Sequence, residues 1–244
     1  IGYCHADVDI LVFDGSTLYV GSDGGIFKTE DSTNLIAGYY TDITRGLGIN
    51  QLYKIGVSQT ADVVISGGSQ DNGTACYKST YGWRDWIGAD GMETFIDKDN
   101  SDRMYGTSQF GQLYRSFDSG LSLTGITEPG SGQGNWVTPW EQDPVELNTS
   151  YLGDSTVYKS TSGGNSWNPA SQNLGGNLDQ LKIAQNNNQV LYASRGSILY
   201  KTEDAGATNW VQLPTPGGGI RSIAIHPTDP DMVAVATSSG NKVF

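Results

Sequence analysis

The segment Tyr158-Lys159-Ser160-Thr161-Ser162-Gly163-Gly164-Asn165-Ser166-Trp167 opens on an aromatic, a basic and a hydroxyl residue. The same kind of triplet recurs at Phe27-Lys28-Thr29, Tyr77-Lys78-Ser79, Tyr114-Arg115-Ser116 and Tyr200-Lys201-Thr202, and Val243-Phe244 would begin the next. The intervals between the aromatic residues are 50, 37, 44, 42 and 44, with a mean of about 43. This period matches the length of a four-stranded propeller blade and is too long for one rung of a β-helix.

Short β-prone runs occupy fixed places around each triplet. A first series lies at Asp9–Asp14, Leu52–Val57, Glu93–Asp97, Leu181–Ile183 and Ile220–Ile225, and a second at Leu18–Val20, Val63–Ile65, Met104–Tyr105, Val190–Tyr192 and Met232–Val235. The unit that leads to the Tyr158 triplet is irregular. We place its first strand near Val137–Gln142, a run that contains Pro139. No segment of helical length holds a 3.6-residue apolar period. We therefore predict an all-β propeller of four-stranded blades, with five units nearly complete and a sixth cut, as one domain over residues 1–244.

Composition narrows the classes of function. The chain has 244 residues, and 14 Lys and Arg against 26 Asp and Glu give a net charge of −12. Nucleic-acid binding needs a basic face, so the charge argues against it. No run approaches the length of an apolar membrane span. The start at Ile1 without Met, and the end at Phe244 within a β-prone run, predict a longer chain with flanking domains.

Metal and disulfide chemistry have few candidate residues. Cys4 and Cys76 allow one disulfide at most, and His5 and His226 are the remaining soft ligands. No CxxC or HxxxH spacing is present, which argues against a zinc site and predicts free or buried thiols. We expect no cofactor, although an acidic face could hold Ca²⁺.

The turn after each triplet carries a family resemblance. Residues 160–167 resemble the Asp-box S-x-D-x-G-x-x-W of BNR-repeat propellers, with Ser162 in place of Asp, and residues 202–210 and 116–123 are similar. The residues that match this pattern are Asp31, Asp118, Gly120, Ser162, Gly164, Trp167, Asp204, Gly206 and Trp210. A short polar side chain can accept N–H bonds across such a turn, Gly takes a positive φ, and Trp covers the hairpin end. We interpret these residues as structural.

The superfamily that the resemblance implies includes sialidases, xyloglucanases and sortilin-like proteins. Within it, residues 5–9, 67–74 and 88–97 resemble large secreted Asp-box proteins of Bacteroidetes-type bacteria. The resemblance implies a secreted or cell-surface protein. It is specific for architecture and says little about chemistry.

The repeat also predicts which residues share a face. In a four-stranded blade, the start of the first strand and the turn between the second and third strands lie at the same end. The strand starts are Asp7, Gln51, Asp90, Trp136, Asn177 and Gly219, and the turns add Asp23, Gln70 to Asn72, Gln109 with Phe110, Asp154 and Arg195. We call this end the funnel face. Carboxylates and amides can bind sugar hydroxyls there, and aromatic rings can stack on sugars, whereas Asp and Asn beside Gly are also ordinary turn formers.

The candidate ligand-binding residues are His5, Asp7, Asp23, Gln70, Asp71, Asn72, Asp90, Glu93 and Trp136. They predict a binding or structural module for an extracellular glycan or protein, without an assigned catalytic residue. The alternative is a glycoside hydrolase of the two-propeller type, with Asp7 and Asp90 as the carboxylate pair. A sialidase would need three clustered arginines for the substrate carboxylate, and only Arg221 and Arg195 fall near the funnel face.

Overall fold

The computed structural model describes residues 4–33, 40–48, 50–130, 133–215, 217–239 and 242–244. These form two compact units, residues 1–51 and residues 52–244, and each is described by itself. The prediction of one domain over 1–244 therefore stays a prediction. In the described part of the chain, no helix is long and apolar enough to cross a membrane.

The first unit is one antiparallel sheet of four strands in sequence order. The strands are β1 (Val8–Asp14), β2 (Thr17–Ser22), β3 (Gly25–Thr29) and β4 (Thr41–Asp42). Leu18 and Val20 of β2 pack with Phe27 of β3 in a small core, because alternate residues of a strand face the same side. β1 is exposed along its whole length.

The second unit holds five further antiparallel sheets, whose strands also pair in sequence order. Four sheets have four strands, and the fifth shows three among the described residues. Their strands are β5 (Lys54–Val57), β6 (Val64–Ser69), β7 (Gly73–Lys78) and β8 (Gly82–Ile87); β9 (Gly91–Ile96), β10 (Met104–Ser108), β11 (Leu113–Ser116) and β12 (Thr124–Ile126); β13 (Trp140–Gln142), β14 (Ser150–Gly153), β15 (Val157–Ser160) and β16 (Asn168–Pro169); β17 (Gln180–Ile183), β18 (Leu191–Arg195), β19 (Ile198–Thr202) and β20 (Val211–Leu213); and β21 (Ile220–Ile225), β22 (Val233–Thr237) and β23 (Lys242–Val243).

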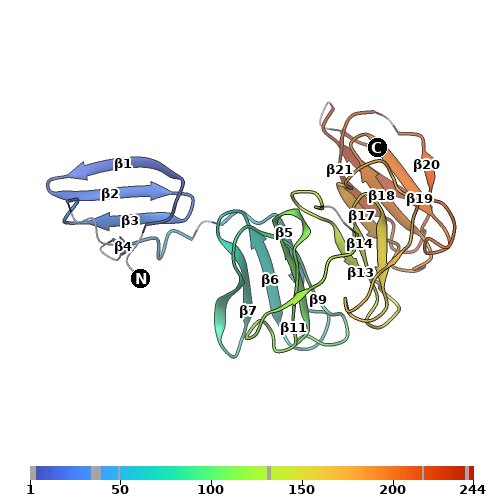
Figure 1. Cartoon of the computed structure of the whole chain (residues 1–244), viewed down its shortest axis with the longest axis horizontal. Coiled ribbons are helices and arrows are strands. Elements are labelled where there is room, and N and C mark those ends of the chain that lie inside the picture. The colour runs from blue at the N-terminus through green and yellow to red at the C-terminus, as the bar shows by residue number, and fades with distance from the viewer. Residues whose placement is uncertain (1–3, 34–39, 49, 131–132, 216, 240–241) are drawn as a thin grey trace. The chain divides into compact units, whose positions relative to one another are not determined.

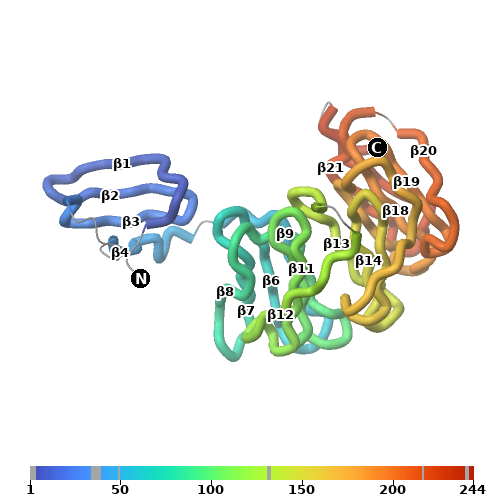
Figure 2. Tube along the Cα trace, viewed as in Figure 1, coloured from blue at the N-terminus to red at the C-terminus, as the bar shows by residue number. Residues whose placement is uncertain are grey.

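The sheets follow one another along the chain, as the colour sequence of the traces shows (Figures 1 and 2). The first strand of each sheet contacts the first strand of the next, from β5 through β9, β13 and β17 to β21. The helical content of the described residues is one 3-10 turn, η1 (Gln109–Gly111). The predicted strand near Val137–Gln142 begins only at Trp140, since Pro139 has no N–H to give to the ladder.

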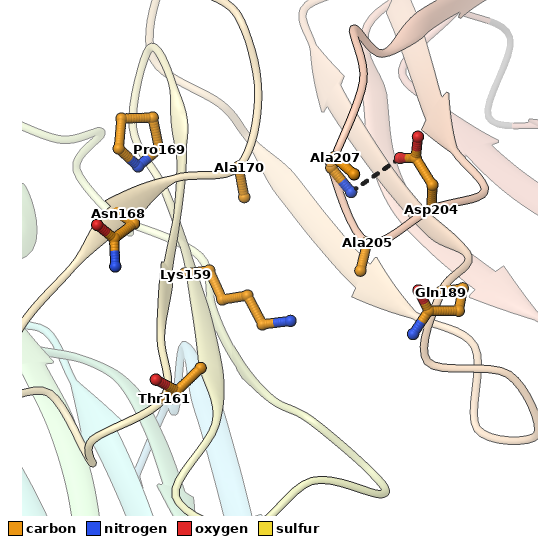
Figure 3. A pocket seen from close by; sticks show the side chains of 10 residues that line it. Lys159, Thr161, Asn168, Pro169, Ala170, Gln189, Asp204, Ala205 and Ala207 are labelled. Carbon is orange, nitrogen blue, oxygen red and sulfur yellow. Dashed lines mark hydrogen bonds between the residues drawn. The ribbon is translucent and has the colours of Figure 1, made fainter.

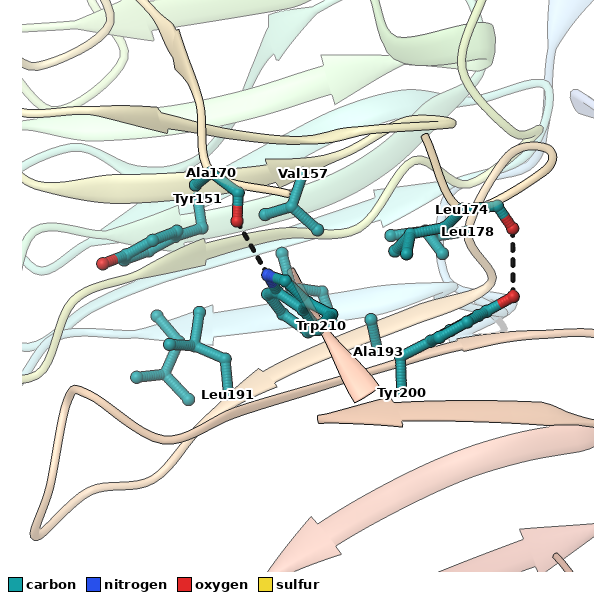
Figure 4. Close-up of a cluster of buried hydrophobic side chains, with 11 residues drawn as sticks. Tyr151, Val157, Ala170, Leu174, Leu178, Leu191, Ala193, Tyr200 and Trp210 are labelled. Atoms are coloured by element: carbon teal, nitrogen blue, oxygen red, sulfur yellow. Dashed lines mark hydrogen bonds between the residues drawn. The ribbon is translucent and has the colours of Figure 1, made fainter. Parts of the chain in front are cut away.

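The core of this unit lies between neighbouring sheets rather than within one sheet. Figure 4 shows the cluster between the third and fourth sheets of the unit, where the Trp210 ring lies among apolar side chains from both. Trp210 Nε1 donates to the carbonyl of Ala170 at 2.7 Å, so the buried ring keeps its hydrogen bond. The sheets also approach closely at Gly206, where a Cβ would meet the Ala170 oxygen at 1.9 Å.

Three turns between third and fourth strands share one geometry. The hydroxyls of Ser116, Ser160 and Thr202 accept the N–H of the glycine four residues later, at 2.9, 2.9 and 3.2 Å. Those glycines are Gly120, Gly164 and Gly206, with φ of 83°, 86° and 82°. Asp118 accepts the N–H of Ser122 at 2.8 Å, and the Ser162 hydroxyl accepts the N–H of Ser166 at 3.0 Å. A hydroxyl thus makes the same contact across the turn as a carboxylate.

The remaining residues of this pattern are also turn or packing residues. In the first unit, Asp31 Oδ1 accepts the N–H of Thr33 at 3.1 Å. Hydrogen bonds from Thr208 and Thr202 lower the pKa of Asp204 to about 2. The Trp167 ring packs against Trp140, with 6.0 Å between their centroids. The structure therefore gives each of these side chains a contact within its own turn or core.

Candidate ligand-binding face

The structure brings several of the predicted ligand residues together at one end of the second unit. Gln70, Asp71 and Asn72 form the turn between β6 and β7, Asp90 directly precedes β9, and Trp136 precedes β13. We keep the name funnel face for this end of residues 52–244. Hydrogen bonds link these segments across three successive sheets.

Asp90 joins two neighbouring sheets. Its Oδ1 accepts the N–H of Asp71 at 2.8 Å, and its own N–H donates to Gln109 Oε1 at 3.2 Å. Asp90 therefore fixes the turn of one sheet to the strand start of the next and to η1. This contact gives Asp90 a positioning role for the surrounding polar groups.

An aromatic cluster lies beside these polar groups. Trp136 Nε1 donates to Tyr53 Oη at 3.1 Å, and the Tyr53 hydroxyl donates to Gln70 Oε1. Phe110 packs edge-on against Trp136, with 5.2 Å between the centroids and 78° between the planes. Tyr53 and Phe110 are 39% and 40% exposed, so their surfaces are open to a ligand.

Sequence reasoning did not single out Tyr53. It lay within a β-prone run, and its partner Trp136 is 83 residues further along the chain. The signal that could have found it is its place directly before the first strand of its sheet, as Asp90 directly precedes β9.

The backbone of the funnel face is strained at three non-glycine residues. Asp71, Ala89 and Phe110 have φ of 61°, 59° and 62°, in the left-handed region. Each such residue costs free energy, and residues of this kind cluster at functional sites. The strain at Phe110 places its exposed ring beside Trp136.

The next sheet repeats the use of a carboxylate to join strands. Asp179 accepts the side-chain N–H of Asn135 at 2.8 Å and the backbone N–H of Gly196 at 2.6 Å. The Asn177 side chain donates to the carbonyl of Gln133 at 2.7 Å. Arg195 Nε donates to the carbonyl of Leu174 at 3.0 Å. Polar groups on this part of the face therefore hold their own loops.

Glu93 does not lie with the predicted ligand residues at the surface. It is 7% exposed on β9, and its Oε2 lies 3.5 Å from Lys54 Nζ of β5. Glu141 of β13 pairs with Lys182 of β17. Burial raises the pKa of Glu93 to about 7, partly offset by Lys54, while the Glu141 charge raises it further. Glu93 is thus part of a charged row along the first strands.

His5, Asp7 and Asp23 belong to the first unit. The His5 ring lies against Gly24 in the β2–β3 turn, where a Cβ would meet its Cγ at 2.2 Å. Asp7 precedes β1 with φ of 56° and is exposed, and Asp23 is exposed in that same turn. Within the first unit, the start of the first strand and the turn after the second therefore lie together, as the repeat predicted.

A cavity lies away from the funnel face, between the third and fourth sheets of the second unit. It has a volume of about 340 Å³ and is lined by Lys159, Asn168, Gln189 and the turn at Asp204 (Figure 3). None of the described residues that line it is aromatic, and both Asp204 oxygens accept hydrogen bonds within the turn. It lacks the stacking surface that the funnel face has.

Comparison with solved structures identifies the architecture. An ancestral GH74 enzyme matches 96% of this chain and 35% of its own length, at 17% identity and a TM-score of 0.63. The GH74 xyloglucanase from Xanthomonas campestris matches 94% of this chain and 43% of its own length, at 17% identity and a TM-score of 0.57. The chain has a β-propeller fold.

The propeller covers well under half of the length of these two neighbours. At 17% sequence identity, the similarity to these two enzymes shows a shared fold and nothing more. A scan against protein-family models and a search of curated proteins find no match.

Proposed function

We propose that this β-propeller is a glycan-binding module whose ligand face is the funnel face of residues 52–244. The observation that carries the proposal is the cluster of Tyr53, Phe110 and Trp136 beside Gln70 and Asp90. Exposed rings next to amide and carboxylate groups suit a sugar, because the rings can stack on its apolar faces and the polar groups can bind its hydroxyls. The net charge of −12 favours a neutral glycan over a polyanion.

The glycan class is proposed from the neighbours. One of them is described as a xyloglucanase, so a neutral β-glucan such as xyloglucan is the first ligand to test. Such polymers are extracellular, which agrees with the expectation of a secreted or cell-surface protein.

Replacing Trp136 with alanine is expected to weaken binding to such a glucan by about tenfold, because it removes a stacking ring and its contacts to Phe110 and Tyr53. The measurement is retardation of the protein in native gels that contain the polysaccharide. Trp83→Ala is the matched control, since Trp83 is 61% exposed on the outer strand β8.

Equal weakening in both tryptophan variants would contradict the proposed face. Wild-type protein that is not retarded by any neutral glycan in the panel, yet captures a peptide, would replace the glycan by a protein ligand. The two tryptophan variants are compared at a temperature at which both are folded, as their melting curves show.

The second candidate is a glycoside hydrolase, and the position of Asp90 on the funnel face favours it. Such enzymes need a pair of carboxylates across the glycosidic bond. Asp90→Asn keeps an oxygen that can accept the Asp71 N–H and removes the charge. We expect the wild-type protein to bind without releasing new reducing ends. Release that disappears in Asp90→Asn but persists in Asp85→Asn, whose carboxylate is exposed on β8, would establish the hydrolase instead.

A further inference from the structure

A very small cavity lies beneath the exposed ring of Phe110. Its volume is about 10 Å³, and its lining includes Phe110, Glu128, Thr138, Leu152 and Asp154. This is about the space that one water molecule or one metal ion needs, and it is far too small for a sugar. Two carboxyl-bearing residues and one hydroxyl-bearing residue thus border a space for a single small species.

Asp154 is buried here without its expected partners. It is 7% exposed in the turn between β14 and β15, and its Oδ1 has no hydrogen-bond donor among the described residues. Its backbone N–H donates to the carbonyl of Thr156 at 3.2 Å. A buried carboxylate oxygen without a donor is costly, so such an oxygen in a native protein points to a water, a proton or an ion.

Gly130 of the Glu128 loop lies against this carboxylate and against the Tyr158 hydroxyl. Gly130 has φ of 80°, and a Cβ on it would lie 3.6 Å from Asp154 Oδ2 and 2.9 Å from Tyr158 Oη. No Lys, Arg or His is among the described residues that line the cavity. Among these described lining residues, the carboxylates therefore have no cationic side chain to balance their charge.

We propose that this cavity is a binding site for one Ca²⁺ ion, held by the carboxylates of Asp154 and Glu128 with the Thr138 hydroxyl. The available donors are all oxygens, which selects a hard cation, and Ca²⁺ accepts irregular geometry better than Mg²⁺ does. Thr138 Oγ1 donates its proton to the carbonyl of Asn135 at 2.8 Å, so its lone pairs are free to face a cation. The site stands independently of the proposed glycan binding.

The position of the site gives it a structural consequence. The backbone of Phe110 is hydrogen-bonded to the segment that precedes β13. The Phe110 N–H donates to Trp136 O at 3.3 Å, and the Gly134 N–H donates to Phe110 O at 3.0 Å. A cation bound below Phe110 would join the Glu128 loop to the β14–β15 turn. Calcium binding is therefore expected to stabilise the fold around this part of the funnel face.

The test is titration of the whole chain with CaCl₂ after treatment with EDTA and removal of the chelator. Calorimetry is expected to show one site, and saturating Ca²⁺ is expected to raise the melting temperature by several degrees. Asp154→Asn is expected to abolish both effects, and Glu128→Gln to weaken binding at least tenfold. Asp85→Asn, which removes an exposed carboxylate on β8, is the matched control and is expected to bind like wild type.

Absence of Ca²⁺ binding to the wild-type chain would overturn the site. So would unchanged affinity in Glu128→Gln, a variant expected to fold because Glu128 is exposed. If Asp154→Asn does not fold, the comparison of Glu128→Gln with Asp85→Asn still decides the question.

Discussion

Replacing Trp140 with alanine is expected to lower the free energy of unfolding by about 3–5 kcal/mol. Trp140 is 1% exposed on β13, and its ring meets Phe95 and Tyr105 of the preceding sheet edge-on, at centroid distances of 5.2 and 5.3 Å. Its Nε1 donates to Ser150 Oγ at 3.0 Å. Truncation would leave a cavity between two sheets and remove a buried hydrogen bond.

Urea denaturation followed by far-ultraviolet circular dichroism would measure the change. Trp140→Phe should retain most of the packing and cost about 1–3 kcal/mol, because the Ser150 hydroxyl loses its donor. Trp83→Ala serves as the exposed control and should change stability by about 0.5 kcal/mol or less. A loss below about 1 kcal/mol for Trp140→Ala would contradict the tight packing of these sheets.

The charged row is expected to make the stability depend on pH through Glu93. The pKa of Glu93 is about 7 in the folded state against an ordinary value of 4.5, so the folded state holds this proton more tightly than the unfolded chain. The resulting stabilisation is fully present below about pH 4.5, decreases as the pH rises towards 7, and is absent above about pH 7. The change is on the order of 3 kcal/mol, at 1.36 kcal/mol for each unit of pKa shift.

Glu93→Gln isolates this contribution, because glutamine has the same shape and does not titrate. The free energy of unfolding of both proteins would be measured by urea denaturation between pH 4 and 8. We expect the wild-type protein to lose stability relative to Glu93→Gln across the window from pH 4.5 to 7. Parallel stability curves would contradict this prediction and would show that the Lys54 charge at 3.5 Å fully offsets the burial of Glu93.

The order of the strands could be predicted from local sequence. The runs at Asp9–Asp14 and Ile220–Ile225 became β1 and β21 with nearly the same limits, because apolar and β-branched residues followed by turn residues favour strands. The run near Val137–Gln142 became the short β13, since Pro139 delays the pairing. The glycines of the turns took the positive φ that the turn chemistry requires.

The sequence could predict the end of the blades at which the candidate site lies, but not the contacts within the site. Position in the repeat placed Asp71, Asp90 and Trp136 at one end, and the hydrogen bonds of the structure join the segments that carry them. It could not predict that Tyr53 meets Trp136, because that contact depends on how three sheets are rotated against one another. Nor could it distinguish Glu93 from the candidate residues at the surface. Glu93 lies three residues after Asp90 and yet is buried beside Lys54.

The sequence by itself therefore determined the repeating unit of this protein: its strands, its turns and the face to which each turn belongs. These depend on side-chain alternation and on backbone preferences within about ten residues, which are local properties. Only the tertiary structure decided which side chains meet between sheets, which carboxylates hold backbone N–H groups, and which are buried without a partner. Those outcomes depend on contacts between residues from 17 to 83 positions apart, where packing and desolvation act on the assembled sheets and leave no mark in any short segment.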